Sequence, residues 1–405
     1  MSFQKTNITT SKAEIKLESL LAITKAINRN LAEEDLFRLF EFMLAEQIGI
    51  PKFAFCEIAK PAKWPLTYNS SEDIRKINIE KDLLPLTEIS SVSDSSQESL
   101  RSFQVIIPVY HKKAPLAYVL IGGMQEDSLL EIKKNDLEFI QTISNIISVA
   151  IENKRLYREN MQQEILRKEL ELAKEMQALL FPSILPNDHI LELSAYYQPQ
   201  RPVGGDYYDY IPLGQDEIII CLADVSGKGI SAALLMANFQ ANIRALAVRS
   251  NHLDQLVSEL NGKVLESAKG EKFITFFIAK YNSVSRELKY VNAGHNPPLL
   301  RSNSGIQILD KGCTGLGIVD QLEVIETGII EIFPDSFLFC YTDGLVEQEN
   351  EGGKDFGIEL LSKILKENTT LSADEFNNLL AEVISSYKGD KPFLDDIAML
   401  SCRFF

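Results

Sequence analysis

The stretch CLADVSGKGISAALLMA, residues 221–237, runs from an apolar segment through a carboxylate and a glycine-rich turn into a helix of small residues. The apolar residues 218–223 have the length of a buried strand, and those from Ala232 onward recur at helical spacing. Asp224 is therefore expected at the end of a strand, beside the core. An ionised carboxylate there is costly unless a cation, a basic side chain or turn amides partner it.

Strand-like and helical segments fill the rest of the second half. The expected strands span 191–197, 217–223, 273–281, 287–293, 337–342 and 397–405. The expected helices span 230–247, 253–268, 357–367 and 372–387. Strands that follow one another through short turns, with helices in pairs elsewhere, favour antiparallel sheets covered by helices over a doubly wound parallel sheet. We therefore predict an α+β fold.

Other aspartates share the position of Asp224 at a strand edge beside a turn. They are Asp206 and Asp209 in RPVGGDYYDY, Asp343 in FLFCYTDGL, and Asp395 and Asp396 before the final strand. A single aspartate of this kind is usually a turn former. Carboxylates that converge repel one another unless a cation holds them, and oxygen donors without His or Cys select Mg²⁺ or Mn²⁺. The residue types alone leave a two-metal site and four unrelated turns equally open.

Composition and charge narrow the class of protein. The chain has 405 residues, enough for two or three domains, and a net charge of −16. This charge argues against a nucleic-acid partner or an anionic membrane surface, since both attract basic proteins. The five cysteines form no C-x-x-C pair and suit a reducing, cytoplasmic compartment. Because the sequence shows no apolar leader and no run of about 18 uncharged apolar residues, we expect neither a secretory signal nor a membrane span.

The first half is typical of an α+β module followed by a long helix. Helical periodicity covers roughly 12–29 and 33–48, and short strand-like runs follow. Residues 134–180 contain no Gly or Pro, and their apolar residues recur at spacings of three, four and seven. This seam would suit a parallel dimeric coiled coil, and the alternative is one helix packed on its own domains.

Six segments of the second half resemble, in order and spacing, the motifs of a known family. They are VGGDYYDY (203–210), CLADVSGKGISAALLMA (221–237), YVNAGHNPPLL (290–300), TGLGI (314–318), FCYTDGLVEQENEGGKDFG (339–357) and DDIAML (395–400). The family is that of bacterial metal-dependent Ser/Thr phosphatases in the protein phosphatase 2C (PPM) superfamily, within its SpoIIE/RsbU branch. The resemblance assigns a phosphatase domain to 187–405 and a helical linker to 153–186. Residues 12–152 resemble a GAF sensor domain in the order of their elements.

This resemblance implies a fold and a cofactor. The fold is an αββα sandwich of two antiparallel sheets flanked by helices, with two Mn²⁺ or Mg²⁺ ions in a cleft at one end. Asp224 would bridge both ions, and the carbonyl of Val225 would bind one of them. Asp343 and Asp395 would complete the shell of the other, and Asp206 would bind a metal directly or through water. A water between the metals would attack the phosphorus of phosphoserine or phosphothreonine in line.

The resemblance also marks residues around the metals or along the phosphate loop. These are Gly205, Asp209, Ser226, Gly227, Gly344, Asp396 and His295. Ser226 stands where animal members of the superfamily carry a histidine proposed as general acid, so the proton donor to the leaving oxygen is unassigned. The superfamily's phosphate-binding arginine has no clear counterpart, and Arg201 is more typical of a solvated loop residue. His295 is more typical of a hydrogen-bonded turn histidine than of a base.

We therefore predict a signal-controlled protein serine/threonine phosphatase. The resemblance implies that its substrate is a phosphorylated STAS-type (anti-sigma-antagonist) protein in partner switching. A GAF-like domain would sense a small molecule or a protein, and the helix would join two copies of the chain. The alternative is a catalytically silent phosphatase-like scaffold, whose mark would be a missing ligand, and none is missing. A nucleotidyl cyclase would need Lys, Asp and Asn positions for nucleotide recognition that we cannot place.

Overall fold

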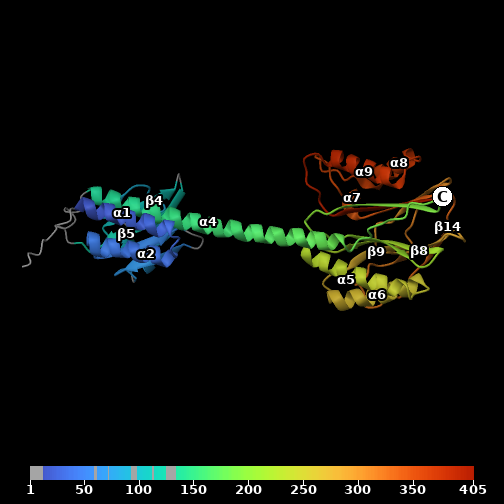
Figure 1. Cartoon of the computed structure of the whole chain (residues 1–405), viewed down its shortest axis with the longest axis horizontal. Coiled ribbons are helices and arrows are strands. Elements are labelled where there is room, and N and C mark those ends of the chain that lie inside the picture. The colour runs from blue at the N-terminus through green and yellow to red at the C-terminus, as the bar shows by residue number, and fades with distance from the viewer. Residues whose placement is uncertain (1–11, 59–61, 72, 93–97, 112–113, 125–133) are drawn as a thin grey trace, which may run out of the picture. The chain divides into compact units, whose positions relative to one another are not determined.

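The computed structural model describes residues 12–58, 62–71, 73–92, 98–111, 114–124 and 134–405 (Figure 1). The chain divides into residues 1–164 and 165–405, which we call unit 1 and unit 2. Each unit has its own hydrophobic core. Among the described residues, no helix combines the length and the apolar character that crossing a membrane requires.

Unit 1 is built on one antiparallel sheet in the order β2-β1-β5-β4-β3. Its strands are β1 (Lys52–Glu57), β2 (Lys63–Tyr68), β3 (Ser90–Ser91), β4 (Val105–His111) and β5 (Ala114–Gly122). Its helical segments before α4 are α1 (Lys12–Asn28), α2 (Glu33–Phe42), η1 (Met43–Ile48), η2 (Asp73–Lys76), η3 (Ile79–Leu83) and η4 (Glu98–Leu100). Because successive strand side chains point to opposite faces, Phe53 and Phe55 pack towards α1 and α2, while Ala54 and Cys56 pack on the other face. The expected α+β character is confirmed.

α4 (Lys134–Ala178) is a helix of 45 residues, and the boundary between the two units falls within it. The segment lacks Gly and Pro and is rich in Leu, Glu, Lys and Gln, which favour helix. Ile140, Ile143 and Ile147 are buried in the core of unit 1. Further along the helix, the exposed apolar side chains include Tyr157, Met161, Ile165, Leu172 and Met176. The long helix expected in this region is confirmed, and the coiled coil stays a prediction.

Unit 2 is a sandwich of two sheets (Figure 1). Sheet 1 has the order β13-β10-β9-β8-β7 with β14 paired to β10, and sheet 2 has the order β12-β11-β15-β16-β6. The strands of sheet 1 are β7 (Tyr207–Pro212), β8 (Glu217–Val225), β9 (Ile274–Asn282), β10 (Glu287–Ala293), β13 (Gly312–Cys313) and β14 (Gly328–Glu331). Those of sheet 2 are β6 (Leu191–Gln198), β11 (Leu299–Ser302), β12 (Gly305–Ile308), β15 (Phe337–Tyr341) and β16 (Ile397–Phe404). The pairings are antiparallel except that of β10 with β13.

Helices cover both outer faces of this sandwich. α5 (Ile230–Ala247) and α6 (Leu253–Ala268) pack on sheet 1, and α8 (Gly357–Glu367) and α9 (Ala373–Lys388) pack on sheet 2. The single-turn helix α7 (Asp343–Val346) follows β15. A third core fills the space between the sheets. The expected αββα arrangement of antiparallel sheets and flanking helices is confirmed.

The central strand β8 shows how this fold positions a carboxylate. Ile219 and Cys221 belong to the core beneath α5 and α6, whereas Ile220 and Leu222 belong to the core between the sheets. Both faces of the strand are therefore buried, which explains its unbroken apolar run. By the same alternation, Asp224 lies on the face that points into the space between the sheets.

The five cysteines all lie in strands and none forms a disulfide. Cys313 is half-buried, and the others are buried: Cys56, Cys221, Cys340 and Cys402.

Candidate active site

Five aspartates from four segments come together at one end of the sandwich in unit 2. We call them the carboxylate cluster: Asp206, Asp224, Asp343, Asp395 and Asp396. Asp224 ends β8, Asp343 follows β15, Asp395 and Asp396 precede β16, and Asp206 precedes β7. β15 and β16 are antiparallel neighbours, so the end of one lies beside the start of the other. The charges of these side chains act on one another, so the convergence that the motifs implied is present.

Asp206 and Asp224 form the buried centre of the cluster. Burial raises the pKa of Asp206 well above its usual range, and the charges of Asp224 and Asp396 raise it further. Burial also raises the pKa of Asp224 to about 7, with Asp343 adding to the rise. The proximity of the two carboxyl groups raises the pKa of Asp206 further and opposes the rise at Asp224. A cation beside them would offset the repulsion between the ionised forms.

Thr342 supports this centre and was not singled out by the sequence. Its Oγ1 donates to Asp206 Oδ2 over 2.8 Å and accepts from the amide of Ala398 over 2.9 Å. Thr342 is fully buried between β15 and Asp343. Its place in the motif YTDG is the only sequence signal that could have marked it.

Asp343 and Asp395 form the outer part of the cluster. Burial raises the pKa of Asp343 to about 6, and the charges of Glu347 and Asp395 add to this rise. Lys228 Nζ lies 2.8 Å from Asp395 Oδ2 and 2.5 Å from the carbonyl oxygen of Leu394. Lys228 therefore forms an ion pair with Asp395, a carboxylate that the sequence analysis assigned to a metal.

The donor set of the cluster fits a hard divalent cation. Every donor side chain is a carboxylate, and oxygen donors are the ligands that Mg²⁺ and Mn²⁺ prefer. The raised pKa values of Asp206, Asp224 and Asp343 show that these anions are held together at a cost, which a bound cation would offset. Within the described residues, no three His, Cys, Asp or Glu side chains are spaced so as to enclose an ion. The carboxylate donors of the site thus fit a hard divalent cation. Their positions in this structure do not form a complete coordination shell.

Asp396 anchors the loop that carries Asp206. Its carboxylate accepts from the amides of Gln200 and Gly205, each over 2.7 Å. Burial raises the pKa of Asp396, and these two amide hydrogen bonds oppose the rise. A Cβ placed on Gly205 would lie 3.0 Å from the carbonyl oxygen of Val225, so the loop passes directly over the carbonyl expected to bind a metal.

The turn between β8 and α5 is fixed by its neighbours. The Ser226 hydroxyl accepts from the amide of Phe273 over 2.9 Å, and Lys272 Nζ donates to the carbonyl of Ser226 over 2.7 Å. Gly227 has a φ of +86°, a left-handed conformation that favours glycine. Ser226 therefore has a structural role: it holds the turn between β8 and α5 in place.

Two glycines near the cluster, Gly344 and Gly229, lie close to atoms of other segments. A Cβ on Gly344 would lie 2.0 Å from the carbonyl oxygen of Asp396, so only glycine lets α7 begin beside β16. Arg201 Nη1 would lie 3.3 Å from a Cβ on Gly229, the residue that precedes α5. The sequence favoured a solvated Arg201. The structure shows an exposed arginine whose guanidinium lies against the turn that follows Asp224.

Asp209 does not join the carboxylate cluster. It shares a face of β7 with Tyr207 and Ile211, which pack in the core beneath α5. Its fully buried carboxylate accepts from Arg244 Nε and Nη2, each over 2.7 Å, and from the Tyr207 hydroxyl. The expected place of Asp209 around the metals is therefore corrected: strand alternation turns it to the opposite face of the sheet, where it ties β7 to α5.

His295 lies behind the cluster as a hydrogen-bonded turn histidine. Its amide donates to Asn292 Oδ1 over 2.7 Å, and its Nδ1 lies 2.9 Å from Thr275 Oγ1. Thr275 is the partner of Asp224 in the pairing of β8 with β9. Burial lowers the pKa of His295 to about 4, although the backbone of Tyr341 opposes this change. The ring is therefore neutral at physiological pH.

This lowered pKa predicts a pH-dependent loss of stability. Below the ordinary pKa of 6.5 the unfolded chain protonates His295, whereas the folded chain resists protonation down to about pH 4, so acid favours unfolding. The stability advantage of wild type over His295→Gln is expected to shrink by about 2 kcal/mol between pH 7 and pH 5. Urea unfolding at both pH values, without metal, measures it. Because the carboxylates titrate in both proteins, a difference that stays constant with pH would contradict the assignment.

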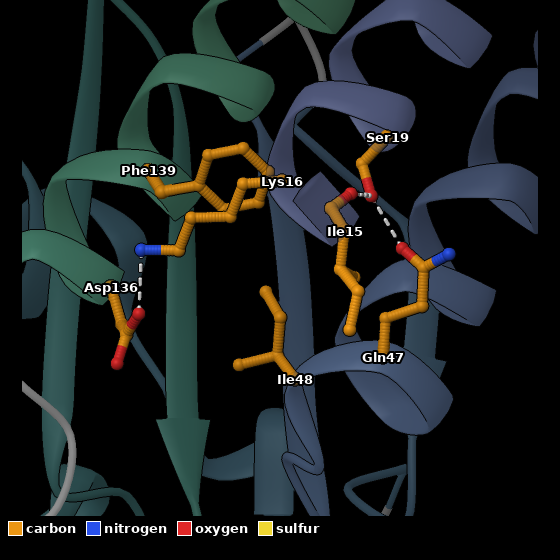
Figure 2. A pocket seen from close by; sticks show the side chains of 7 residues that line it. All are labelled: Ile15, Lys16, Ser19, Gln47, Ile48, Asp136 and Phe139. Carbon is orange, nitrogen blue, oxygen red and sulfur yellow. Dashed lines mark hydrogen bonds and ion pairs between the residues drawn. The ribbon is translucent and has the colours of Figure 1, made fainter. Parts of the chain in front are cut away.

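Unit 1 contains a small cavity of its own between α1, η1 and the start of α4 (Figure 2). Lys16 Nζ lies 2.6 Å from Asp136 Oδ1 and also lies over the ring of Phe139. The cavity has a volume of about 60 Å³. This leaves room for only a few water molecules. The cavity does not identify a signal for this unit.

Carboxylates gathered at one end of an αββα sandwich define the PPM class of metal-dependent phosphatases. The profile of the family described as Stage II sporulation protein E (SpoIIE) matches residues 214–405. The SiaA-PP2C domain of Pseudomonas aeruginosa shares the fold, with a TM-score of 0.54 and 22% identity over 60% of this chain and 98% of that one.

Two of the relatives that the chain matches in sequence are phosphoserine phosphatases. The chain is 30% identical to phosphoserine phosphatase RsbU of Bacillus subtilis (strain 168) over 258 residues, which cover 61% of this chain and 73% of RsbU. It is 27% identical to phosphoserine phosphatase RsbP of the same organism, covering 45% of this chain and 46% of RsbP. It is 26% identical to protein IcfG of Synechocystis sp. (strain ATCC 27184 / PCC 6803 / Kazusa), covering 61% and 43%. The chain thus spans less than half of RsbP and IcfG, and it belongs to the SpoIIE/RsbU family of PPM-type phosphatases.

Proposed function

We propose that this protein is a Mn²⁺- or Mg²⁺-dependent protein serine/threonine phosphatase. The observation that carries the proposal is the convergence of Asp206, Asp224 and Asp343: burial raises the pKa of each, and the charges of neighbouring carboxylates raise it further. A protein that only docked a partner would gain nothing from keeping these anions together at a cost. The similarity to two phosphoserine phosphatases supports the same conclusion.

The residues have separable tasks in this proposal. Asp224 would bind two ions, with the Val225 carbonyl and Asp206 on one side and Asp343 and Asp395 on the other. Such ions supply a hydroxide nucleophile near neutral pH and offset charge on the phosphoryl oxygens.

Three residues outside this ligand set complete the site. Asp396 would keep the loop of Asp206 in place through the amides of Gln200 and Gly205. Lys228 would have to leave Asp395 before that carboxylate could bind an ion. The guanidinium of Arg201, beside Gly229, would bind phosphoryl oxygens.

We further propose the physiological setting. By family resemblance, the substrate is a phosphorylated STAS-type protein in a cytoplasmic partner-switching system. Unit 1 would be a GAF-like sensor for a small molecule or a protein, and the exposed apolar residues of α4 would join two chains in a parallel coiled coil. A sedimentation-equilibrium mass of one chain would contradict the dimer. Activity that stays constant across substitutions in the core of unit 1 would contradict the regulatory role.

The experiment that tests the activity uses the full chain and a phosphoserine-bearing STAS protein. Phosphate release is measured with Mn²⁺, with Mg²⁺ and with excess EDTA, and calorimetric titration measures Mn²⁺ binding without substrate. We expect release with a divalent ion and none in EDTA. Absence of both Mn²⁺ binding and phosphate release would overturn the proposal in favour of a silent scaffold.

Arg201 offers a test of phosphate recognition. Arg201→Ala is expected to raise KM for the phosphoprotein by about 10-fold, because it removes a charge-assisted hydrogen bond to the phosphoryl group. Mn²⁺ affinity should not change, since Arg201 is not a metal ligand, and Arg201→Lys should lose less. The matched control is Arg249→Ala, an exposed arginine just beyond the other end of α5. Equal effects of the two alanine variants would argue against a role for Arg201.

A further inference from the structure

Gln177, in the last turn of α4, makes a two-point contact with the catalytic domain in unit 2. Its Nε2 donates to the carbonyl oxygen of Gly204 over 2.7 Å, and the amide of Gly204 donates to its Oε1 over 3.1 Å. The side chain is 7% exposed. A carboxamide carries a donor and an acceptor on one planar group, so it can pair with both the N–H and the C=O of a single residue's backbone. The contact therefore depends on the amide chemistry of Gln177 as well as on its position.

The loop that Gln177 contacts carries Asp206. Residues 199–206 connect β6 to β7, and side chains hold their backbone in place. Asp396 accepts hydrogen bonds from the backbone amides of Gln200 and Gly205. Gln177 binds the backbone N–H and C=O of Gly204, which lies between those two residues in the loop. One anchor comes from the carboxylate cluster itself, and the other comes from α4.

The end of α4 is a firm support for this contact. The carbonyl of Leu180, just after the helix, accepts from Gln240 of α5 over 3.3 Å. The ring of Phe181 packs against Tyr197 and Tyr208, with centroid distances of 5.1 and 4.8 Å. Because the helix end is docked on both sheets of the sandwich, Gln177 has little freedom to follow a moving loop.

We propose that Gln177 is a positioning residue of the phosphatase site: it fixes the backbone of Gly204 and Gly205 so that Asp206 is presented to the cation site. The inference rests on the proposed function for its catalytic meaning. It goes beyond that function because Gln177 belongs to the helical linker and lies outside the motifs of the phosphatase domain. The inference gives this linker residue a part in orienting a metal ligand. Leucine at 177 offers neither hydrogen bond, and glutamate offers only acceptors and faces the Gly204 carbonyl with a negative charge.

The test compares Gln177→Leu and Gln177→Glu with Gln240→Leu in the full chain. Gln240 is the matched control, because it holds the same helix end through Leu180 without touching the loop. Calorimetric titration with Mn²⁺, without substrate, is expected to show about 10-fold weaker binding for both Gln177 variants, as for other residues that orient a metal ligand. Gln240→Leu should stay within about two-fold of wild type, since it leaves every hydrogen bond of the loop in place. Thermal melting checks that all variants fold.

A double-mutant cycle separates positioning from general damage. In an Asp206→Asn background, Gln177→Leu should cause no further loss of Mn²⁺ affinity, because the ligand that it positions is already gone. If Gln177→Leu and Asp206→Asn lowered Mn²⁺ affinity by amounts that add up in the double variant, the proposal would be overturned. Wild-type Mn²⁺ affinity in Gln177→Leu would overturn it as well.

Hydrogen exchange gives a readout that does not depend on metal or activity. In metal-free protein, Gln177→Leu is expected to speed exchange of the Gly204 and Gly205 amides, while Gln240→Leu leaves them protected. Gly205 is the decisive amide, since it is bonded to Asp396 and loses protection only if the loop itself moves. Unchanged exchange at Gly205 would overturn the positioning role even if the proposed phosphatase activity were correct, and faster exchange would support it even if that activity were absent.

Discussion

Asp224→Asn is expected to lower metal-dependent phosphate release by on the order of 10³-fold, since the proposed role of Asp224 as a bridge between two ions would be worth several kcal/mol of transition-state stabilisation. Asparagine keeps the size of the side chain and one oxygen, so the loss reflects charge and bridging capacity. The measurement is kcat with saturating phosphoprotein and Mn²⁺. Asp216→Asn is the matched control, because Asp216 is an exposed aspartate just before the other end of β8. Activity of Asp224→Asn within about ten-fold of that control would contradict a role for Asp224 in catalysis.

The same variant is expected to gain stability when metal is absent. Burial and Asp343 raise the pKa of Asp224 from 3.8 to about 7, so the native state prefers the protonated form. It therefore loses stability as the pH rises between these two pKa values, and the loss is complete above about pH 7. At pH 8 in EDTA, Asp224→Asn should therefore be more stable than wild type by about 2–4 kcal/mol. Urea unfolding measures the difference. A less stable variant under these conditions would mean that the carboxylate is already compensated by protein groups.

Arg244→Leu is the second variant with a large expected effect, on stability rather than on chemistry. It leaves the carboxylate of Asp209, whose side chain is 0% exposed, without its charged partner. Breaking a buried pair typically costs 3–5 kcal/mol, but the arginine side chain is 44% exposed, so we expect about 2–3 kcal/mol. Unit 2 should then melt about 5–10 °C lower.

The control for Arg244→Leu is the double variant with Asp209→Asn. The amide carries no charge and can still accept from the Tyr207 hydroxyl, so the double variant should recover most of the lost stability. Thermal melting of the three proteins in EDTA makes the comparison. If the double variant melts no higher than Arg244→Leu, the cost comes from lost packing of the arginine and not from the unpaired carboxylate.

Much of the fold of unit 2 could be predicted from the sequence, because its principal strands are buried on both faces. β8, β9, β15 and β16 are unbroken apolar runs between turns, and each was expected within about two residues. β7 was not expected. Its sequence YYDYIP is interrupted by Asp209, and the arginine that makes this carboxylate compatible with a strand follows 35 residues later in the chain. The β11–β12 hairpin was missed because it is short and its outer strand is largely exposed.

The candidate site was only partly predictable for a similar reason. The motifs identified each aspartate of the carboxylate cluster, because every one follows or precedes a recognisable strand. The partners that decide what each aspartate does come from distant segments. Asp396 binds the backbone 191 and 196 residues earlier, and Thr342 binds Asp206 across 136 residues. No spacing rule connects such pairs, so the sequence could not show that Asp209 faces away from the cluster or that Gln177 contacts the loop that carries Asp206.

The strand positions of the five cysteines make the protein convenient for fluorescence work. A thiol reacts with maleimide dyes as its thiolate, and burial suppresses ionisation here: it raises the pKa of Cys56 to about 12 and that of the half-buried Cys313 to about 11. The native thiols should therefore label slowly near neutral pH. A single cysteine introduced at the exposed Gln215, whose backbone does not have the left-handed φ of the neighbouring Gly214, would be the preferred point of attachment. A dye there could report on unit 2 without first removing the natural cysteines.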